Sequence, residues 1–415
     1  MYDWANSAFS TTVMAGFFPI FFEKYWSDGE NVVQSTYQLG LANSAASIFI
    51  AALAPLLGAI ADRGSAKKKF LIFFCYLGVV MTGGLFLVGQ GEWQLAIMLF
   101  IVATVGFMGA NIFYDSLLPS VASKEKMDYV SSLGFAVGYI GGGLLFLVNV
   151  VMYLYPEWFG IPDPATAIKL SFLSVALWWG IFTIPLLIFV PEPDIREPIS
   201  LGSAVTEGYR QMMVTFKHIR ELKVIGIFLL AYWLYIDGVD TIIRMSVKIG
   251  SSLGFEAGDL ITALLMVQFI AFPAALVYNW FASKVGTKKA VLIAIGGYSL
   301  VTLLAFFMSN KNHFFMLAAL IGLFQGGIQA LSRSLYARLI PKGSEAEFYG
   351  FYNMLGKFAA VVGPLLIGGV SLMTGNVRLG ILSILILFIG GAFLLSKVDF
   401  IKGEELAHQF SSNEK

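Results

Sequence analysis

Long apolar runs make up most of the sequence, and they restrict the chain to a membrane protein. About twelve runs of roughly 20 residues are long enough to cross the ~30 Å hydrocarbon core of a bilayer as α-helices. They centre on residues 5–25, 36–60, 70–89, 94–116, 130–153, 168–190, 223–247, 258–281, 290–308, 313–336, 348–372 and 378–396. Only 13% of residues are charged, about half the share of a soluble domain. We therefore expect an all-α protein with twelve transmembrane helices.

The longest polar connection divides these spans six and six. We predict an N-terminal six-helix bundle at 1–190, a linker at 191–222, a C-terminal six-helix bundle at 223–396 and a polar tail at 397–415. Lysine and arginine gather in loops that fall on one side of the predicted membrane, and the positive-inside rule makes that side cytoplasmic. An even number of spans then places both termini, the linker and the tail in the cytoplasm.

Several functional classes are disfavoured by composition. A net charge of +1 gives no basic surface for nucleic acid. One cysteine, Cys75, excludes an internal disulfide, and the three histidines lack metal-ligand spacing. The N-terminus lacks the basic region of a signal peptide, so we expect the first span to be retained. No nucleophile elbow, phosphate loop or metal motif occurs, so we expect neither an enzyme nor a cofactor.

An internal repeat relates the two halves. Lys67 and Lys68 align with Lys288 and Lys289 at an offset of 221 residues. At an offset of 222, four further residues align with their counterparts: Tyr114 with Tyr336, Pro119 with Pro341, Gly134 with Gly356 and Gly141 with Gly363. Two parallel six-helix repeats around a site near the midplane are a common transporter design.

Five sequence stretches resemble a known family. "GAIADRGSAKKK" (58–69) is similar to the loop signature of the major facilitator superfamily. "YDWANSAF", "DGVDTII", "QGGIQALSRSLYARLIP" and "FYGFYNMLGKFAAVVGP" resemble the vacuole-effluxer or "unknown major facilitator" family, in its prokaryotic branch. The resemblance covers about residues 2–395. It implies the major facilitator fold, with two pseudo-symmetric six-helix bundles, and a transport function; the yeast member is linked to amino-acid efflux from the vacuole.

Polar residues in span one lie on one helical face. Asp3, Asn6, Ser7, Ser10 and Thr11 are spaced by three, four and seven residues. Such a face lines a cavity or contacts another helix, because lipid cannot satisfy it. We place Asn6 and Ser10 among the candidate substrate-binding residues.

Span seven holds two acids and an arginine. Asp237, Asp240 and Arg244 can share a face, and Asp240 with Arg244 can form a local pair. Asp237 lies roughly 21 Å into the helix, past the midplane, and this pairing leaves it without a partner in its own helix. Gly238 beside it permits close approach of a backbone or a ligand. We expect Asp237 to be a cavity acid, with a permanent ion pair between spans seven and ten as the alternative.

Spans ten, eleven and four carry the other intramembrane polar groups. Gln325, Gln329 and Arg333 form a ladder spaced by four. The planar guanidinium suits a carboxylate or phosphate, and the alternative is a structural bridge from Arg333 to an acid such as Asp237 or Asp240. Lys357, four residues after Asn353, either contacts substrate or pairs with an acid in the other half.

Span four contributes Asn111 and Asp115, which lies close to the cytoplasmic end of its helix. By analogy with the superfamily, Asp115 pairs with the loop arginine Arg63, and together with Asp62 these residues form a gate. Span four has no arginine, which disfavours the proton-driven drug antiporters of the superfamily.

The predicted function is secondary active transport of a small polar solute by rocker-switch alternating access. Nine residues are the candidates for substrate binding: Asn6, Ser10, Asn111, Asp237, Asp240, Gln325, Gln329, Arg333 and Lys357. Because they include both charge signs, an amino acid is the favoured cargo, with organic anions, phosphate compounds and amphiphiles as alternatives. A membrane receptor or scaffold is the non-transport alternative. We expect a monomer in the bacterial inner membrane, with a proton or cation as coupling ion.

Overall fold

The computed structural model describes residues 1–27, 32–192, 223–252 and 255–413, together with Thr206, Tyr209, Arg210 and Met213. Within these residues every regular element is a helix. The predicted linker at 191–222 lies almost wholly outside the described residues, so its boundaries stay a prediction.

The helices reproduce the twelve predicted spans. The first half contains α3 (Val32–Arg63), α4 (Lys67–Gly84), α5 (Trp93–Ser116), α7 (Met127–Leu154) and α8 (Pro164–Phe189), with short α6 (Leu118–Val121), η3 (Leu85–Leu87) and η4 (Pro156–Phe159) between them. The second half contains α10 (Lys223–Ser252), α11 (Ala257–Val285), α12 (Thr287–Phe306), α13 (Lys311–Leu339), α14 (Glu345–Thr374), α15 (Val377–Leu382), α16 (Leu385–Lys397) and α17 (Phe400–Asn413). Ten helical runs in the described residues are long and apolar enough to cross a membrane. The helical run at 2–26 and α14 supply the other two spans.

Span one is less regular than its sequence predicts. It consists of α1 (Tyr2–Ala8), η1 (Phe9–Phe17), α2 (Phe18–Phe21) and η2 (Phe22–Trp26). η1 and η2 are wide π-helical segments, in which the N–H groups of Phe18 and Ser27 donate to carbonyls five residues back. A face computed for 3.6 residues per turn therefore applies to α1 but not to Ser10 and Thr11, which lie in η1.

Local sequence explains where several helices begin. Asp163 caps α8 by accepting a hydrogen bond from the backbone N–H of Thr166 at 2.9 Å, and Pro164 occupies the first helical position. Asn310 caps α13 in the same way through the N–H of His313, at 3.0 Å. The Asp163 side chain lies outside the spans, and its hydrogen bonds from the N–H and then the hydroxyl of Thr166 lower its pKa.

Backbone contacts divide the chain into two compact units. Unit 1 comprises 1–52, 68–114 and 137–192. In it, α1 and η1 pack against α8, and the stacked rings of Phe18 and Phe100 lie 4.0 Å apart between centroids.

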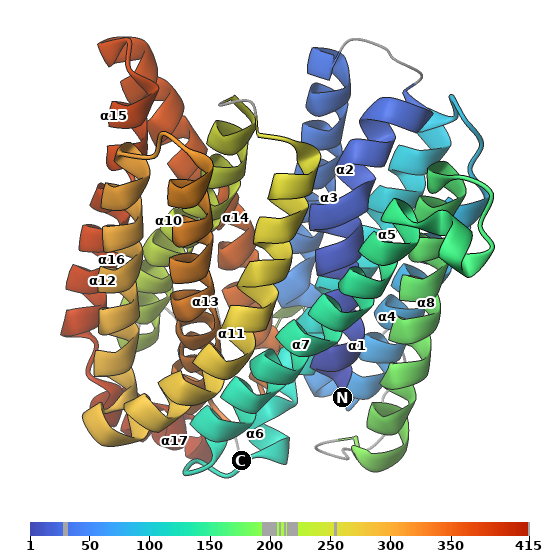
Figure 1. Ribbon diagram of the computed structural model, residues 1–415. Helices are drawn as coiled ribbons and strands as arrows, with labels where there is room; N and C mark the ends of the chain where they lie inside the picture. Colours follow the sequence, from blue (N-terminus) through green and yellow to red (C-terminus); the bar gives the residue numbers. More distant parts are fainter. Residues whose placement is uncertain are drawn as a thin grey trace. The chain divides into compact units, whose positions relative to one another are not determined.

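Unit 2 comprises 53–67, 115–136 and 193–415. It therefore joins the last turns of α3, α6 and the first turns of α7 to the helices of the second half. Within it, α10 packs on α14 and α16, and α13 packs on α11 and α12 (Figure 1). α17 covers the ends of α10 and α13, so the predicted polar tail contains an ordered helix.

Two glycines bring α3 and α14 together within unit 2. A Cβ on Gly58 would collide with the backbone of Ala346, and a Cβ on Gly350 would collide with the backbone of Ala54. Because only glycine permits this approach, the sequence builds a close crossing between the end of α3 and the start of α14. This crossing positions the polar clusters described next.

Candidate functional site

The central feature of unit 2 is a buried ion pair between α13 and the end of α5. Arg333 is 5% exposed, and its Nη1 lies 3.1 Å from Oδ1 of Asp115. Its Nε donates to the hydroxyl of Ser131 at 3.0 Å, and its Nη2 donates to the carbonyl of Ser131 at 3.1 Å. The guanidinium also lies 4.5 Å from the ring centroid of Phe135. All three guanidinium nitrogens thus have partners on α5 or α7.

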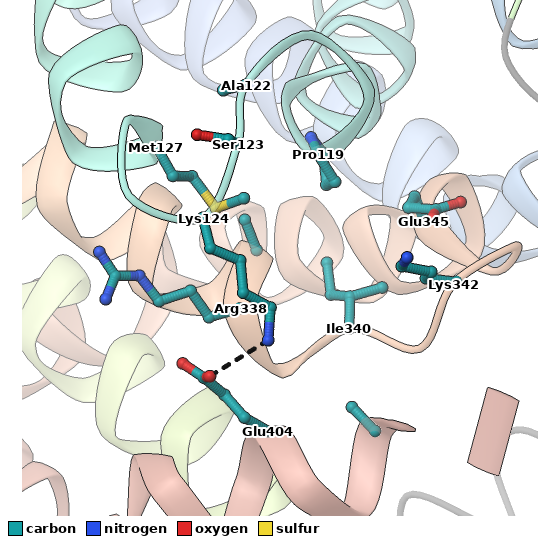
Figure 2. A pocket seen from close by; sticks show the side chains of 12 residues that line it. Pro119, Ala122, Ser123, Lys124, Met127, Arg338, Ile340, Lys342, Glu345 and Glu404 are labelled. Carbon is teal, nitrogen blue, oxygen red and sulfur yellow. Dashed lines mark hydrogen bonds and ion pairs between the residues drawn. The ribbon is translucent and has the colours of Figure 1, made fainter. Parts of the chain in front are cut away.

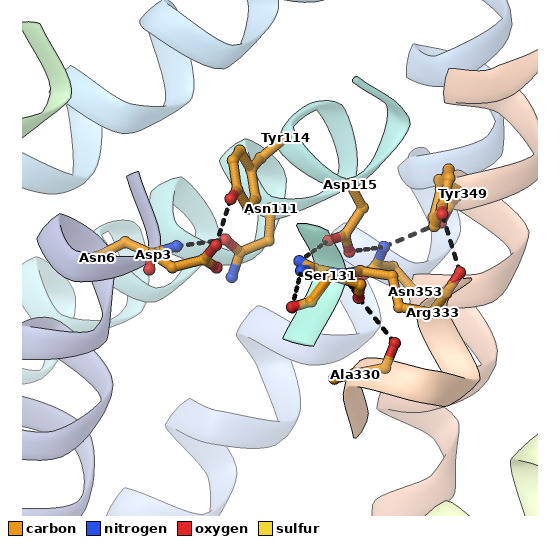
Figure 3. A network of polar contacts seen from close by, with 10 residues as sticks. All are labelled: Asp3, Asn6, Asn111, Tyr114, Asp115, Ser131, Ala330, Arg333, Tyr349 and Asn353. Carbon is orange, nitrogen blue, oxygen red and sulfur yellow. Dashed lines mark hydrogen bonds and ion pairs between the residues drawn. The ribbon is translucent and has the colours of Figure 1, made fainter. Parts of the chain in front are cut away.

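Neutral groups complete this Arg333 cluster (Figure 3). The amide of Asn353 donates to Oδ2 of Asp115 at 3.3 Å and to the carbonyl of Tyr349 at 3.0 Å. The hydroxyl of Tyr349 donates to the carbonyl of Arg333 at 3.2 Å. A buried charge pair is tolerated when its remaining donors and acceptors are satisfied, and here they are satisfied by α14.

Two sequence hypotheses are sharpened by this geometry. Arg333 acts here as a bridge to Asp115, whereas the sequence suggested Asp237 or Asp240 as its acid. Asp115 was expected beside Arg63; it is bound by Arg333, from a helix 218 residues away in sequence. Arg63 is half-buried at the end of α3.

A second cluster, formed by Asp62, Lys67 and Glu345, joins α3 to α14. Both oxygens of Asp62 accept backbone hydrogen bonds from the first turn of α14, from Ala346 at 3.1 Å and Glu347 at 2.8 Å. Asp62 therefore caps a helix from the other half of the sequence, and its negative charge favours that helix N-terminus. Lys67 lies 3.0 Å from Asp62 and 2.7 Å from Glu345, with its side chain almost fully buried.

A third cluster surrounds Asp128, in the first turn of α7. Its carboxylate accepts hydrogen bonds from Ser334 and from Thr287, each at 2.6 Å, and lies 2.8 Å from Nη2 of Arg338. Thr287 follows the second-half loop that corresponds to the loop before Lys67. Each loop therefore contacts the first turn of a helix from the opposite half. Asp128 was not among the residues predicted from the sequence, although it directly follows the basic loop at 123–127.

In unit 1, polar residues of α1 contact α5. The amide of Asn6 donates to Oδ1 of Asn111 at 2.6 Å, and the hydroxyl of Tyr114 donates to the carboxylate of Asp3 (Figure 3). Asn6 and Asp3 are buried, whereas Asn111 is half-buried. Ser10 is half-buried and donates to the carbonyl of Ser7 at 3.0 Å. The polar face of span one thus makes helix–helix contacts, and Asn111 keeps part of its surface exposed.

Asp237 lies at the contact between α10 and α14. It is 1% exposed, and both of its oxygens accept from the N–H of Gly363, at 3.1 and 3.0 Å. The hydroxyl of Thr241 donates to Oδ1 at 3.1 Å. The expectation that Asp237 lacks a partner in its own helix was wrong, because a threonine four residues later brings its hydroxyl to the same face. A Cβ on Gly363 would collide with Thr241, so glycine is needed for this contact.

The remaining candidates are placed as follows. Asp240, Gln325 and Gln329 are half-buried on α10 and α13. The side chains of Arg244 and Lys357 lie outside the described part of the chain, so the proposed Asp240–Arg244 pair and the role of Lys357 stay predictions.

A stack of tyrosines, which the sequence did not predict, lies beside the Arg333 cluster. The rings of Tyr232 and Tyr352 stack at 4.0 Å between centroids, and those of Tyr336 and Tyr352 at 4.9 Å. These rings come from α10, α13 and α14, so they form a rigid aromatic wall next to Tyr349. Tyrosines three residues apart, such as 349 and 352, were the available signal.

Similar solved structures define the class of this fold. The human organic anion transporter MFSD10 aligns over 95% of this chain and 97% of its own, with a TM-score of 0.66 and 17% identity. The proton:xylose symporter XylE aligns over 95% and 92%, with a TM-score of 0.68 and 12% identity. The chain has the major facilitator superfamily fold.

Sequence comparisons identify the family within this class. The profile described as "Vacuole effluxer Atg22 like" matches residues 31–408. The MFS-type transporter YxiO of Bacillus subtilis is 39% identical over 402 residues, which cover 96% of this chain and 93% of YxiO. Autophagy-related protein 22 of Yarrowia lipolytica is 24% identical, over 85% of this chain and 74% of that protein. The chain belongs to the vacuole effluxer Atg22-like family and is a multi-pass membrane transporter, which confirms the resemblance inferred from the motifs.

Proposed function

We propose that this transporter moves a small polar solute, with an amino acid as the favoured cargo, by alternating access. The observation that carries the proposal is that three polar clusters connect first-half segments of unit 2 to second-half helices: the Arg333, Asp62 and Asp128 clusters. All three lie toward the basic loops. The positive-inside rule makes that end cytoplasmic, so we assign these contacts to a state closed toward the cytoplasm.

Polar contacts suit a gate because they are directional and reversible. A buried ion pair contributes little net stability relative to apolar packing, but removing one partner is strongly destabilising. On opening, water re-solvates both charges, so the closed and open states can differ by only a few kcal/mol. Cargo or a coupling ion can shift an equilibrium of that size.

The proposed cargo depends on which charged side chains a solute can reach when the protein is closed or open toward the cytoplasm. In the closed state, Arg333 is fully engaged by Asp115 and Ser131. Opening releases the planar guanidinium of Arg333, which can then donate two parallel hydrogen bonds to one carboxylate. Asp237 or Asp240 would hold the amine of a zwitterion. An organic anion or a phosphate compound needs only the arginine, so the two classes of cargo differ in their need for the acids.

We further propose that Asp237 is the coupling group. Its hydrogen-bond donors in the described part of the chain are neutral groups, namely the N–H groups of Gly363 and Val362 and the hydroxyl of Thr241. When Asp237 is protonated, one of its two oxygens becomes a hydroxyl, which is a poor acceptor for the N–H of Gly363. Proton binding would therefore loosen the contact between α10 and α14 and link protonation to movement of α14.

Transport by purified protein in liposomes tests the cargo. Preloaded vesicles should exchange a labelled neutral amino acid, and Asp237→Asn with Asp240→Asn should weaken its binding while sparing that of a matched monocarboxylate. Exchange of organic anions or phosphate esters without exchange of any amino acid would overturn the cargo assignment. Absence of exchange for all solutes, in protein that remains folded, would favour the receptor alternative.

A further inference from the structure

Between α17 and the end of α13, unit 2 contains a cavity of about 330 Å³ (Figure 2). Its walls come from the α6–α7 connection, the end of α13 with the turn that follows, and α17 itself. It lies beyond the Arg333 cluster and shares no residue with the candidate substrate site.

The residues that line the cavity include both cationic and apolar side chains. Lys124, Arg338 and Lys342 contribute positive charge, and Met127 and Ile340 contribute apolar surface. The Nε of Arg338 is buried and has no hydrogen-bond acceptor within the described residues, although its Nη2 is bound to Asp128.

Two acids also reach the cavity, and they differ in how firmly they are held. Glu345 is buried and is bound by Lys67 at 2.7 Å and by the N–H of Gly343 at 3.0 Å. Glu404 of α17 contacts Lys124 at 3.3 Å, with side chains that are 30% and 47% exposed. The contact between Glu404 and Lys124 is therefore weak and exchangeable, whereas Glu345 is part of the Asp62 cluster.

We propose that this cavity is a regulatory site for a small anion, namely a phosphate group carried on a short apolar body. The anion displaces the carboxylate of Glu404 from Lys124 and accepts hydrogen bonds from the Lys124 ammonium group, while the positive charges of Arg338 and Lys342 attract it further. Its apolar body packs on Met127 and Ile340. Phosphate suits a cluster of lysine and arginine donors because its oxygens accept several charge-assisted hydrogen bonds at once.

The same geometry predicts the effect of the ligand. The Pro119–Met127 wall belongs to the first half of the sequence, and the other walls belong to the second half. The cavity is complete only while these segments meet, so a ligand that binds it stabilises the closed state by mass action. The anion is therefore an inhibitor that slows opening; this effect rests on the proposed closed state, whereas binding of the anion to the cavity is independent of the cargo.

Binding of butyl phosphate to purified protein tests the proposal, with sodium chloride at matched ionic strength as the salt control. The parent protein should show a saturable rise in Tm and slowed exchange in liposomes. Glu404→Gln removes the competing carboxylate and should bind about tenfold more tightly. Lys124→Gln removes a charge-assisted hydrogen bond and should bind about tenfold more weakly.

The two variants are expected to change anion affinity in opposite directions, which distinguishes a binding site from a purely structural contact. If the Lys124–Glu404 contact only supports α17, both variants lower Tm alike and neither changes anion affinity, which overturns the proposal. A rise in Tm that has the same dependence on ligand concentration in Lys124→Gln as in the parent, or that sodium chloride reproduces, also overturns it. Nanodiscs test whether the phosphate belongs to a lipid. If phosphatidic acid stabilises the parent but not Lys124→Gln, and butyl phosphate has no effect, the ligand is a lipid headgroup.

Discussion

Removal of one charge from the Arg333 cluster should open the gate that we propose at the cytoplasmic end. Asp115→Asn preserves the shape of the side chain but leaves Arg333 buried without its counter-ion. Breaking a fully buried pair costs about 3–5 kcal/mol. The loss here should be about 2–3 kcal/mol, because Arg333 keeps its bonds to Ser131 and its contact with Phe135. The open state gains nothing from this pair, so the equilibrium should shift toward it by about 30- to 150-fold.

Cysteine labelling measures this shift directly. Ala330 is fully buried in α13, and Cys75 is the only native cysteine. In a Cys75→Ser background, an Ala330→Cys reporter should react with a water-soluble maleimide about 30- to 150-fold faster when Asp115→Asn is present. Asp163→Asn is the matched control, because it removes the same charge from a helix cap in unit 1 and should leave labelling unchanged.

A double-mutant cycle supplies the decisive comparison. Adding Arg333→Gln to Asp115→Asn removes the uncompensated charge, so the double variant should label more slowly than Asp115→Asn alone. Strictly additive effects of the two substitutions, or unchanged labelling in Asp115→Asn, would refute the assignment of this pair to the gate.

Four further predictions concern single residues. Asp62→Ala should lower stability by more than the ~0.5–2 kcal/mol of a lost cap, because it also removes a partner of the buried Lys67; Asp62→Asn should cost less, because one of the two accepting oxygens remains, and Tm comparison decides. Arg333→Lys should weaken cargo binding about tenfold, since a point charge cannot reproduce a bidentate contact, and full affinity would exclude a substrate role. Asp237→Asn should abolish pH-driven accumulation yet leave solute exchange measurable; normal accumulation with the parental pH dependence would exclude it as the coupling group. Asp163→Ala should lower Tm slightly at neutral pH. Because the folded-state pKa of Asp163 is depressed, that difference is present above its unfolded-state pKa and should shrink as pH falls through the folded-state pKa; a difference that grows on acidification would contradict the capping role.

The spans were predictable from sequence because hydropathy and length are local properties. Each apolar run must satisfy its own backbone in lipid, so it forms a helix wherever it lies. The repeat between Lys67 and Lys288 likewise needs only the sequence to be recognised. The motifs at 325–341 and 348–364 further identified the family.

Side-chain partners were decided by tertiary structure alone. Arg333 and Asp115 are 218 residues apart in sequence, and Lys67 and Glu345 are 278 apart. Several intramembrane acids were available to Arg333, and periodicity ranks residues on one helix but carries no information about which helix faces it. The same limit hid the role of Asp128, because an acid after a basic loop resembles a solvated charge until α12 and α13 bring Thr287, Ser334 and Arg338 to its carboxylate.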